Sequence, residues 1–240
     1  MRVLVLRAAG TNCDRETAHA FESVGATAEA RHVNELLADP TLLRDFGILV
    51  IPGGFSYGDD VAAGRVLATE LKQKILPETW RFIGNGGLVL GICNGFQVLV
   101  KMGLLPGWDE QVVTLAHNES HRYQDEWVDL DVVTSRCEFV VEGQEFAFPI
   151  AHAEGKFVAD DATLARLEET GQIVFRYRNN PNGSLHDIAG ICDMTGRVLG
   201  LMPHPERHLE PWHHPCWTRR GLAEEPDGLH FFRRAVAVTS

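Results

Sequence analysis

Apolar and polar positions follow two periods along the first half of the chain. Three runs rich in Val, Leu and Ile, at 2–7, 46–52 and 87–92, are apolar for most of their length and predict buried strands. A further strand is predicted at 26–33, and helices are predicted over 14–24, roughly 60–74, and 94–102. Strands and helices that alternate in this way favour right-handed βαβ units around a parallel sheet.

The second half of the chain has shorter apolar runs that are separated by turn-forming residues. Strands are predicted there at 126–133, 137–141, 146–151, 172–178, 188–193 and 197–203. Residues 207–228 contain three prolines and show no clear periodicity, which predicts a long surface loop before a last helix at 229–237. We therefore predict a single α/β domain over residues 1–240, a flavodoxin-like fold with a mostly parallel central sheet flanked by helices and a second half of mixed strands.

The charge of the chain limits the classes of partner. The formal net charge is −11, and the only dense basic spots are the pairs at 219–220 and 233–234, which are too short to follow a phosphate backbone. No apolar run approaches the ~20 residues that a membrane helix needs. The N-terminal apolar run ends at Arg7, which does not fit a signal peptide. We expect a cytoplasmic protein that binds neither nucleic acid nor a membrane.

The cysteines indicate free thiols in a reducing compartment. There are five, their spacings are wide, and no C-x-x-C pair occurs, which argues against a disulfide framework and a zinc ribbon. His213, His214 and Cys216 lie close together in sequence but lack a second pair of ligands. His117 and His121 are spaced i,i+4 without the H-E-x-x-H pattern, so we expect no metal site.

One cysteine stands between glycines where a predicted strand meets a predicted helix. Residues 91–95 (GICNG) fit the G-x-nucleophile-x-G turn, in which small neighbours let the turn close and let a substrate approach. Cys93 would then lie at a helix N-terminus, whose dipole favours the thiolate form. A buried structural cysteine in a βα turn is the alternative, and the five residues alone do not decide between the two.

A nucleophilic thiol needs a base, and the base needs a group that orients it. The apolar run at 198–203 ends in His204-Pro205-Glu206. Pro205 keeps His204 extended, and positions i and i+2 of an extended chain point to the same side, so Glu206 can reach one ring nitrogen of His204. Both this segment and the turn at Cys93 follow strands whose carboxyl ends build the sites of open α/β sheets.

An acyl intermediate on Cys93 would carry an oxyanion, which needs N–H donors already in place. Gly53 and Gly54 follow the apolar run that ends at Pro52 and can supply one donor. Asn94, directly after the cysteine, can supply the other. A plain turn is the alternative interpretation of the two glycines.

Taken together, these segments resemble a known family. GGFSYGD (53–59), GICNGFQ (91–97) and MPHPER (202–207) are similar to the triad-type, or class I, glutamine amidotransferases, and more narrowly to the glutaminase subunits of phosphoribosylformylglycinamidine synthase in purine biosynthesis. The segments NESHR (118–122) and PIAHAEGKF (149–157) agree with that family, and the resemblance extends from residue 1 to about 236.

The resemblance implies a function and a set of site residues. Cys93 is the expected nucleophile, His204 its base and Glu206 the orienting acid, with Gly53, Gly54 and Asn94 at the oxyanion hole. Gln97, one helical turn after Cys93, is expected to help hold the substrate glutamine. The resemblance further implies that glutamine is hydrolysed to glutamate and ammonia, and that the isolated subunit is slow.

The cofactors are expected on partner subunits. The chain has no phosphate-binding G-x-x-x-x-G-K-[ST] loop, because Gly155-Lys156 is followed by Phe157 and lacks the upstream glycine. By the resemblance, ATP, Mg²⁺ and formylglycinamide ribonucleotide bind a separate synthetase subunit, which takes up the ammonia, and a small bridging subunit completes the complex. This chain is expected to hold no cofactor.

Some stretches differ from the usual pattern of the family, and two other interpretations stay open. Residues 123–127 (YQDEW) replace an expected aromatic-Glu-Cys-Arg stretch, and the loop at 207–228 is longer and richer in His and Trp. A cysteine-type α/β hydrolase would share the turn at Cys93 but place its acid and its histidine far apart, with the acid first. A flavodoxin-like regulatory or binding module would use Cys93 as a redox sensor.

Overall fold

A computed structural model describes residues 1–108 and 110–239, so position 109 and the last residue of the predicted domain lie outside the description. The strands are β1 (Arg2–Arg7), β2 (Thr27–His32), β3 (Ile48–Ile51), β4 (Leu88–Ile92), β5 (Val113–His117), β6 (Gln124–Val132), β7 (Glu145–His152), β8 (Glu154–Ala159), β9 (Ile173–Tyr177), β10 (Ile188–Cys192) and β11 (Val198–Leu201). The α-helices are α1 (Asp14–Ser23), α2 (Val33–Ala38), α3 (Arg65–Lys74), α4 (Leu76–Gly84), α5 (Asn94–Met102), α6 (Asp161–Glu169), α7 (Trp217–Arg220) and α8 (Asp227–Ala237). Short 3₁₀ turns lie at Pro40–Asp45, Ser56–Asp59, Leu185–Asp187 and Pro205–Arg207.

Nine strands form one mixed sheet in the order β2-β1-β3-β4-β11-β10-β9-β6-β7. The pairs from β2 to β11 are parallel, and the pairs from β11 to β7 are antiparallel. Strands β3 and β4 are buried along their whole length, which is why their sequences are apolar without alternation. The predicted α/β fold, with a parallel first half and mixed strands in the second, is confirmed. β5 and β8 form a separate antiparallel ribbon.

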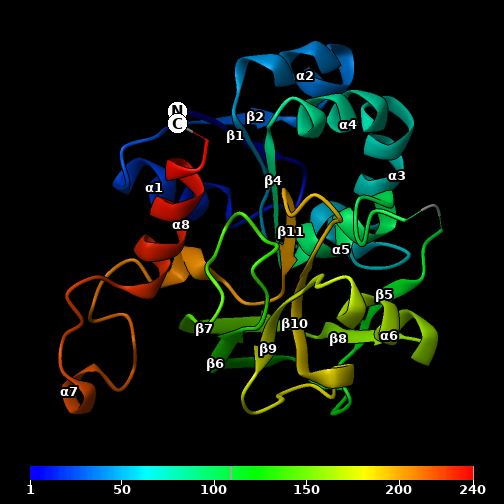
Figure 1. Cartoon of the computed structure of the whole chain (residues 1–240). Coiled ribbons are helices and arrows are strands. Elements are labelled where there is room, and N and C mark those ends of the chain that lie inside the picture. The colour runs from blue at the N-terminus through cyan, green and yellow to red at the C-terminus, as the bar shows by residue number, and fades with distance from the viewer. Residues whose placement is uncertain (109, 240) are drawn as a thin grey trace.

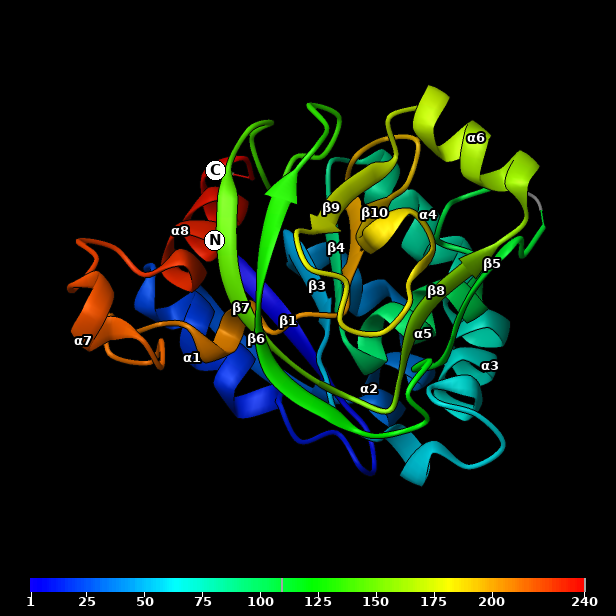
Figure 2. The ribbon, with the colours of Figure 1, turned by 90° about the horizontal axis from the view of Figure 1, so that it is seen from below.

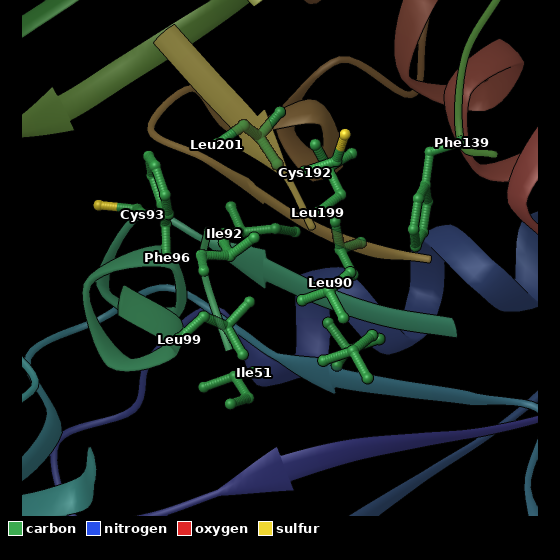
Figure 3. Close-up of a cluster of buried hydrophobic side chains, with 14 of the residues drawn as sticks. Ile51, Leu90, Ile92, Cys93, Phe96, Leu99, Phe139, Cys192, Leu199 and Leu201 are labelled. Atoms are coloured by element: carbon green, nitrogen blue, oxygen red, sulfur yellow. The ribbon is translucent and has the colours of Figure 1, made fainter. Parts of the chain in front are cut away.

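Helices cover both faces of the parallel half of the sheet (Figure 1). Figures 1 and 2 show α1 and α8 together on one face and α3, α4 and α5 on the other. Phe21 of α1 and Phe232 of α8 meet edge-to-face with ring centroids 4.8 Å apart. On the opposite face, the side chains of Phe96 and Leu99 of α5 lie against those of β4 and β11 (Figure 3). The two strands and the helix that lead into the predicted site therefore share one core.

One predicted strand does not form, and one predicted helix begins later than expected. The strand predicted at 137–141 is a turn: Phe139 is buried there and stacks on Phe231 of α8, with ring centroids 6.1 Å apart. Its apolar residues pack beneath a helix instead of joining a strand ladder. The helix predicted from residue 60 begins only at Arg65, because Gly64 before it has the left-handed φ of 71°.

Apart from the single turn of α7, which lies within the predicted surface loop, five helices and strands of the structure were not predicted from the sequence. These are α2, α4, α6 and the two strands of the ribbon, β5 and β8. The ribbon carries Glu154 at its start, next to the buried end of β7. The carbonyl of Glu154 accepts a hydrogen bond from Gln97 of α5.

The segment at 207–228 projects from the body of the molecule around the single turn of α7 (Figures 1 and 2). Its base is held by two buried histidines, His208 and His214, whose rings both contact Trp127 of β6. Trp212 and Leu222 farther along are exposed. The segment is thus anchored through its two buried histidines, while Trp212 and Leu222 face the solvent.

Candidate active site

A sharp turn between β4 and α5 presents Cys93. Its φ of 51° and ψ of −106° lie in a region that residues other than glycine rarely adopt. The backbone N–H of Cys93 donates to the carbonyl of Leu201 at 2.8 Å, which ties the turn to the end of β11. Figure 3 shows the sulfur at the margin of the apolar cluster, pointing away from Leu90 and Ile92. The strained turn therefore places the thiol at the edge of the core, where Cys93 is still buried.

The glycines beside the nucleophile are required by close backbone contacts. A Cβ added to Gly95 would lie 1.8 Å from the carbonyl oxygen of Ile51 in β3, far inside van der Waals contact. A Cβ added to Gly91 would lie 2.7 Å from the carbonyl carbon of Gly95. The first turn of α5 consequently packs directly on two strands, as the G-x-nucleophile-x-G pattern requires.

His204 and Glu206 follow β11, the parallel neighbour of β4. Leu201 of β11 is in register with Ile92 of β4, so the two chains leave the sheet side by side. Nδ1 of His204 and Oε1 of Glu206 are 2.6 Å apart, and both side chains are buried. The backbone N–H of His204 donates to the carbonyl of Pro149 at 2.8 Å. The sequence-predicted pair therefore meets in the predicted orientation, with Nε2 free of any hydrogen bond within the described residues.

The surroundings of His204 favour its charged form. Burial acts to lower the pKa of His204, but the Glu206 carboxylate and the Cys93 sulfur, which lie nearby, raise it well above its ordinary value. An imidazolium held between a carboxylate and a sulfur can donate a proton to a leaving group and take one back. This is the electrostatic arrangement of a cysteine–histidine–acid site.

The two glycines of the 53–59 loop lie against these side chains. A Cβ added to Gly53 would lie 2.8 Å from Cε1 of His204 and 3.5 Å from Cβ of Cys93. Gly54 has a φ of 140°, and it pairs with Thr11 in an isolated bridge. The loop backbone thus passes beside His204 and Cβ of Cys93, and Gly53 has no side chain to separate them. A nearby N–H is what an oxyanion hole requires.

Asn94 and Gln97 belong to a buried hydrogen-bond network. The Asn94 side-chain oxygen accepts from the Ser56 hydroxyl at 2.6 Å, and its nitrogen donates to Asp59 at 3.0 Å and to Gln97 at 3.1 Å. Gln97 in turn donates to the carbonyl of Glu154 at 2.6 Å. The network joins the 53–59 loop, α5 and β8.

Burial of Gln97 changes how its predicted role must be understood. Its amide oxygen and nitrogen are both engaged within the protein, so the residue is no helix-surface side chain. A contact between Gln97 and glutamine stays a prediction. The contacts present show Gln97 holding the ribbon against the helix that carries Cys93. Burial raises the pKa of Asp59 in the same network.

Three polar residues near the site were not singled out as site residues in the sequence analysis. Cys13 follows β1, and its sulfur is 3.2 Å from the position of a Cβ added to Gly53. Ser56 holds Asn94, as described above. His152, within the PIAHAEGKF segment, is buried and hydrogen-bonds Asn118 at 3.1 Å, and the carbonyl of its neighbour Ala151 is 3.9 Å from Sγ of Cys93. Their place in the sequence could have revealed them. Each of the three follows or ends a strand at the edge of the sheet where Cys93 lies.

Burial and the positive charge of His204 lower the pKa of His152 to about 4, so its imidazole is neutral near pH 7. All five cysteines are free thiols, as predicted. No helix in the described part of the chain is long and apolar enough to cross a bilayer.

This fold and this site define the class of the protein: a nucleophilic cysteine on a strand-to-helix turn, with His-x-Glu after the neighbouring strand, is the arrangement of a class I glutamine amidotransferase. The sequence model of the CobB/CobQ-like glutamine amidotransferase domain matches residues 1–238. The chain therefore belongs to the glutamine amidotransferases, and within them to the family of PurQ subunits of phosphoribosylformylglycinamidine synthase, as its relatives show.

The relatives match over nearly their whole length. Phosphoribosylformylglycinamidine synthase subunit PurQ of Dehalococcoides mccartyi is 46% identical over 246 residues, which cover 98% of this chain and 96% of that protein. The same subunit of Methanococcus maripaludis is 44% identical over 224 residues, covering 87% of this chain and 82% of its own. A solved structure of PurLQS from Thermotoga maritima superposes with a TM-score of 0.78 at 32% identity, covering 100% of this chain and 99% of that one. Neither a cysteine-type α/β hydrolase nor a regulatory module fits this membership.

Proposed function

We propose that this chain releases ammonia from glutamine through a thioester on Cys93, with His204 as the acid–base group and Glu206 as its orienting acid. The observation that carries the proposal is the buried 2.6 Å contact between His204 and Glu206, placed beside a cysteine on a strained strand-to-helix turn. Geometry of this kind fixes the tautomer and the direction of the imidazole before substrate arrives.

The reaction proceeds in two halves. The Cys93 thiolate attacks the side-chain amide carbon of glutamine, and the electron pair of the carbonyl moves onto its oxygen. Collapse of this intermediate breaks the C–N bond, and His204 donates its Nε2 proton to the departing nitrogen, which leaves as ammonia. In the second half His204 takes a proton from water as the water attacks the thioester. Glutamate leaves, and the thiolate and the imidazolium are restored.

The oxyanion of each intermediate would lie between the 53–54 backbone and the backbone N–H of Asn94. Asn94 begins α5, so its N–H has no partner within the helix and the helix dipole adds to the attraction. The hydrogen bonds from Ser56 to the Asn94 side chain hold the loop and the helix at a constant separation. Fixed donors of this kind need no reorganisation as charge develops.

The ammonia would be consumed on other subunits. The related structure of Thermotoga maritima is that of PurLQS, and we propose that this chain assembles with a synthetase subunit of the PurL type and a small bridging subunit of the PurS type. ATP and Mg²⁺ would bind the synthetase subunit, and formylglycinamidine ribonucleotide would be made there from formylglycinamide ribonucleotide. The complex would act in the cytoplasm, in purine biosynthesis.

The experiment that tests this proposal is labelling with a glutamine-like diazoketone, followed by peptide mapping by mass spectrometry. We expect one label, on Cys93, and protection by excess glutamine. The assay is run on the chain alone and on the chain with its synthetase and bridging subunits, because partner binding can complete a site. Labels spread over several cysteines in the complex, indifferent to glutamine, would contradict the proposal.

A matched control uses a buried thiol outside the site. Cys192 is buried at the end of β10. The Cys192→Ser variant is expected to be labelled like the wild type, whereas Cys93→Ser is expected to take no label. Equal labelling of Cys192→Ser and Cys93→Ser would show that the reagent reacts with any thiol and does not select an activated nucleophile.

A further inference from the structure

A polar cavity of about 470 Å³ lies apart from the three catalytic side chains, none of which lines it. It is bounded by α3, by α5 and by the ribbon of β5 and β8, which lie side by side in Figures 1 and 2. Its volume falls within the range of small-molecule sites, about 300–1,000 Å³. The reaction proposed above gives this cavity no role.

Three cationic side chains line the cavity, whereas the chain as a whole is acidic, with a net charge of −11. Arg65 and Lys72 come from α3, and Lys101 comes from α5. Glu154 is the one acidic residue in the described part of the lining, so three positive charges face one negative charge. None of the three cations forms a salt bridge or a side-chain hydrogen bond with the described residues. Their charge is therefore available to a ligand.

Lys101 is the cation of this cavity with the least access to water, because it is half-buried while the other two are exposed. Burial lowers the pKa of its ammonium group, and the charge of Arg65 adds to this effect, whereas the carboxylates of Glu154 and Asp59 oppose it. An ammonium that has lost water without gaining a hydrogen-bond partner is in an unfavourable environment. A bound anion would supply the partner.

The other polar groups of the lining favour a ligand that carries hydroxyls. Gln73, Gln111 and Thr114 offer amide and hydroxyl groups, and the ionised carboxylate of Glu154 can only accept hydrogen bonds. A hydroxyl can donate to that carboxylate, whereas a second phosphate group would be repelled by it. No aromatic side chain lines the cavity in the part of the chain that the structure describes, so no ring is offered on which a nucleobase could stack.

We propose that this cavity binds a phosphorylated sugar, with the phosphate on Arg65, Lys72 and Lys101 and the hydroxyls on Glu154 and Thr114. A phosphate monoester carries a charge of about −1.5 to −2 near pH 7, which matches the excess of positive over negative side chains in the cavity. The guanidinium of Arg65 can hold two phosphate oxygens at once, and the two lysines add point charges.

The cavity is next to the catalytic network and does not form part of it. Lys101 follows Gln97 by about one turn of α5. The backbone carbonyl of Glu154 accepts from Gln97, while the side chain of Glu154 lines the cavity. A ligand bound there needs neither Cys93 nor turnover, so this site and the proposed glutaminase reaction can each be present without the other.

Isothermal titration of the full chain at low ionic strength tests the proposal, with ribose 5-phosphate, inorganic phosphate and ribose as probes. We expect ribose 5-phosphate to bind one-to-one, more tightly than the other two probes, and to bind less tightly as salt screens the charges. Lys101→Gln is expected to weaken this binding by about 10-fold or more, the effect of losing one hydrogen bond between charged groups. Arg65→Gln is the second variant, because Arg65 is exposed and its replacement leaves the core intact.

Lys74→Gln is the matched control, because Lys74 is an exposed lysine of the same helix that does not line the cavity. It changes the net charge by as much as Lys101→Gln does, yet it is expected to bind ribose 5-phosphate like the wild type. Glu154→Ala separates the sugar from the phosphate. Without the carboxylate, inorganic phosphate should bind more tightly, and the advantage of ribose 5-phosphate over inorganic phosphate should shrink.

Failure of the wild type to bind ribose 5-phosphate, or equal losses in Lys74→Gln and Lys101→Gln, would overturn the proposal. Tighter binding of adenosine monophosphate than of ribose 5-phosphate would contradict the proposed class of ligand. In the assembled complex, the difference between the wild type and Lys101→Gln is expected to persist. Its disappearance there would show that a partner subunit covers the cavity, which would rule out a ligand site.

Discussion

Among single residues, the proposed reaction depends on two side chains that are held in uncommon states. Cys93 has a φ of 51°, a strained backbone that an ordinary helix start would not require. His204 is buried yet carries a raised pKa, because the carboxylate and the sulfur beside it outweigh the cost of burial. In the proposed reaction Glu206 does not touch the substrate; it holds one nitrogen of His204 and leaves the other for the reacting atoms.

The Glu206→Gln variant tests the orienting role. We expect kcat for glutamine hydrolysis in the complex to fall on the order of 10⁴-fold, the loss seen when an orienting acid becomes an amide that favours the wrong tautomer. The pKa of His204 should also fall, since burial would then be opposed by the Cys93 sulfur without the Glu206 carboxylate. The upper limb of the pH profile of Cys93 labelling, which reports loss of the imidazolium proton, should move to lower pH.

Glu16→Gln provides the control for that measurement. Glu16 is an exposed carboxylate of α1 that pairs with Arg207 at 3.4 Å, close to the site but outside the His204 pair. Its kcat and pH profile are expected to match the wild type. An active Glu206→Gln variant with an unshifted profile would show that Glu206 has only a structural role.

At the scale of secondary-structure elements, the site depends on how closely α5 packs against the sheet. Gly95 allows the first turn of this helix to touch the backbone of β3, and Gly91 allows β4 to pass beneath it. Phe96, the residue after Gly95, lies against Gly200 of β11, where an added Cβ would be 2.1 Å from a ring carbon. Because Gly91, Gly95 and Gly200 have no side chains, α5 can pack close to the sheet, and this packing fixes the position of Cys93.

The Gly95→Ala variant is expected to lose stability, because its Cβ would meet the carbonyl oxygen of Ile51 at 1.8 Å and backbone cannot move aside easily. Overpacking of this kind costs about 1–3 kcal/mol, which a urea midpoint detects. Gly84→Ala is the matched control: Gly84 ends α4, and nothing lies within 4 Å of its added Cβ. That variant should be neutral or slightly more stable, and a Gly95→Ala variant of equal stability would contradict the close packing.

At the scale of the whole molecule, one sheet joins a parallel half and an antiparallel half at β11. The nucleophile comes from the parallel half, whereas the carbonyl of Ala151, beside Cys93, comes from β7 at the far antiparallel edge. Strand β7 reaches the site because it is long and curves across the molecule in Figure 2. Folding of both halves is therefore needed to complete the site.

The stability of the whole chain is expected to fall in mild acid because of His152. Its folded pKa is about 4, below the usual value near 6.5, so between these pH values the unfolded chain binds a proton that the folded chain does not. The unfolding free energy therefore decreases as pH falls from 6.5 to 4, by up to about 3 kcal/mol from this group. Urea titrations at several pH values measure this slope.

His152→Gln should remove this part of the slope, whereas His19→Gln, at an exposed position of α1, should leave the slope at its wild-type value. The difference between the slopes of the two variants removes the contribution of the carboxylates, which titrate in the same pH range. If both variants kept the wild-type slope, His152 would be protonated in the folded protein and the assigned burial effect would be wrong.

Much of the fold and of the site follows from short-range pattern. Strand β1 and helix α5 have the predicted bounds, since an apolar run and a helical repeat are local properties of the chain. Cys93, His204 and Glu206 could be predicted as site residues because each follows a recognisable strand end. Residues 137–141 misled the prediction, because Phe139 owes its burial to α8 and not to a neighbouring strand.

The class of chemistry could be predicted from local patterns, because the glycine-flanked cysteine and the His-x-Glu after an apolar run adopt a backbone conformation that follows from their own residues. Which distant groups meet at the site depends on the tertiary fold. Cys13 lies beside His204, and Arg207 donates to the Cys13 sulfur, although the bonded pair is 194 positions apart. Gln97 is buried because the unpredicted β8 supplies Glu154 as its acceptor. Such contacts depend on how strands are ordered in the sheet, and that order is set by packing over the whole chain.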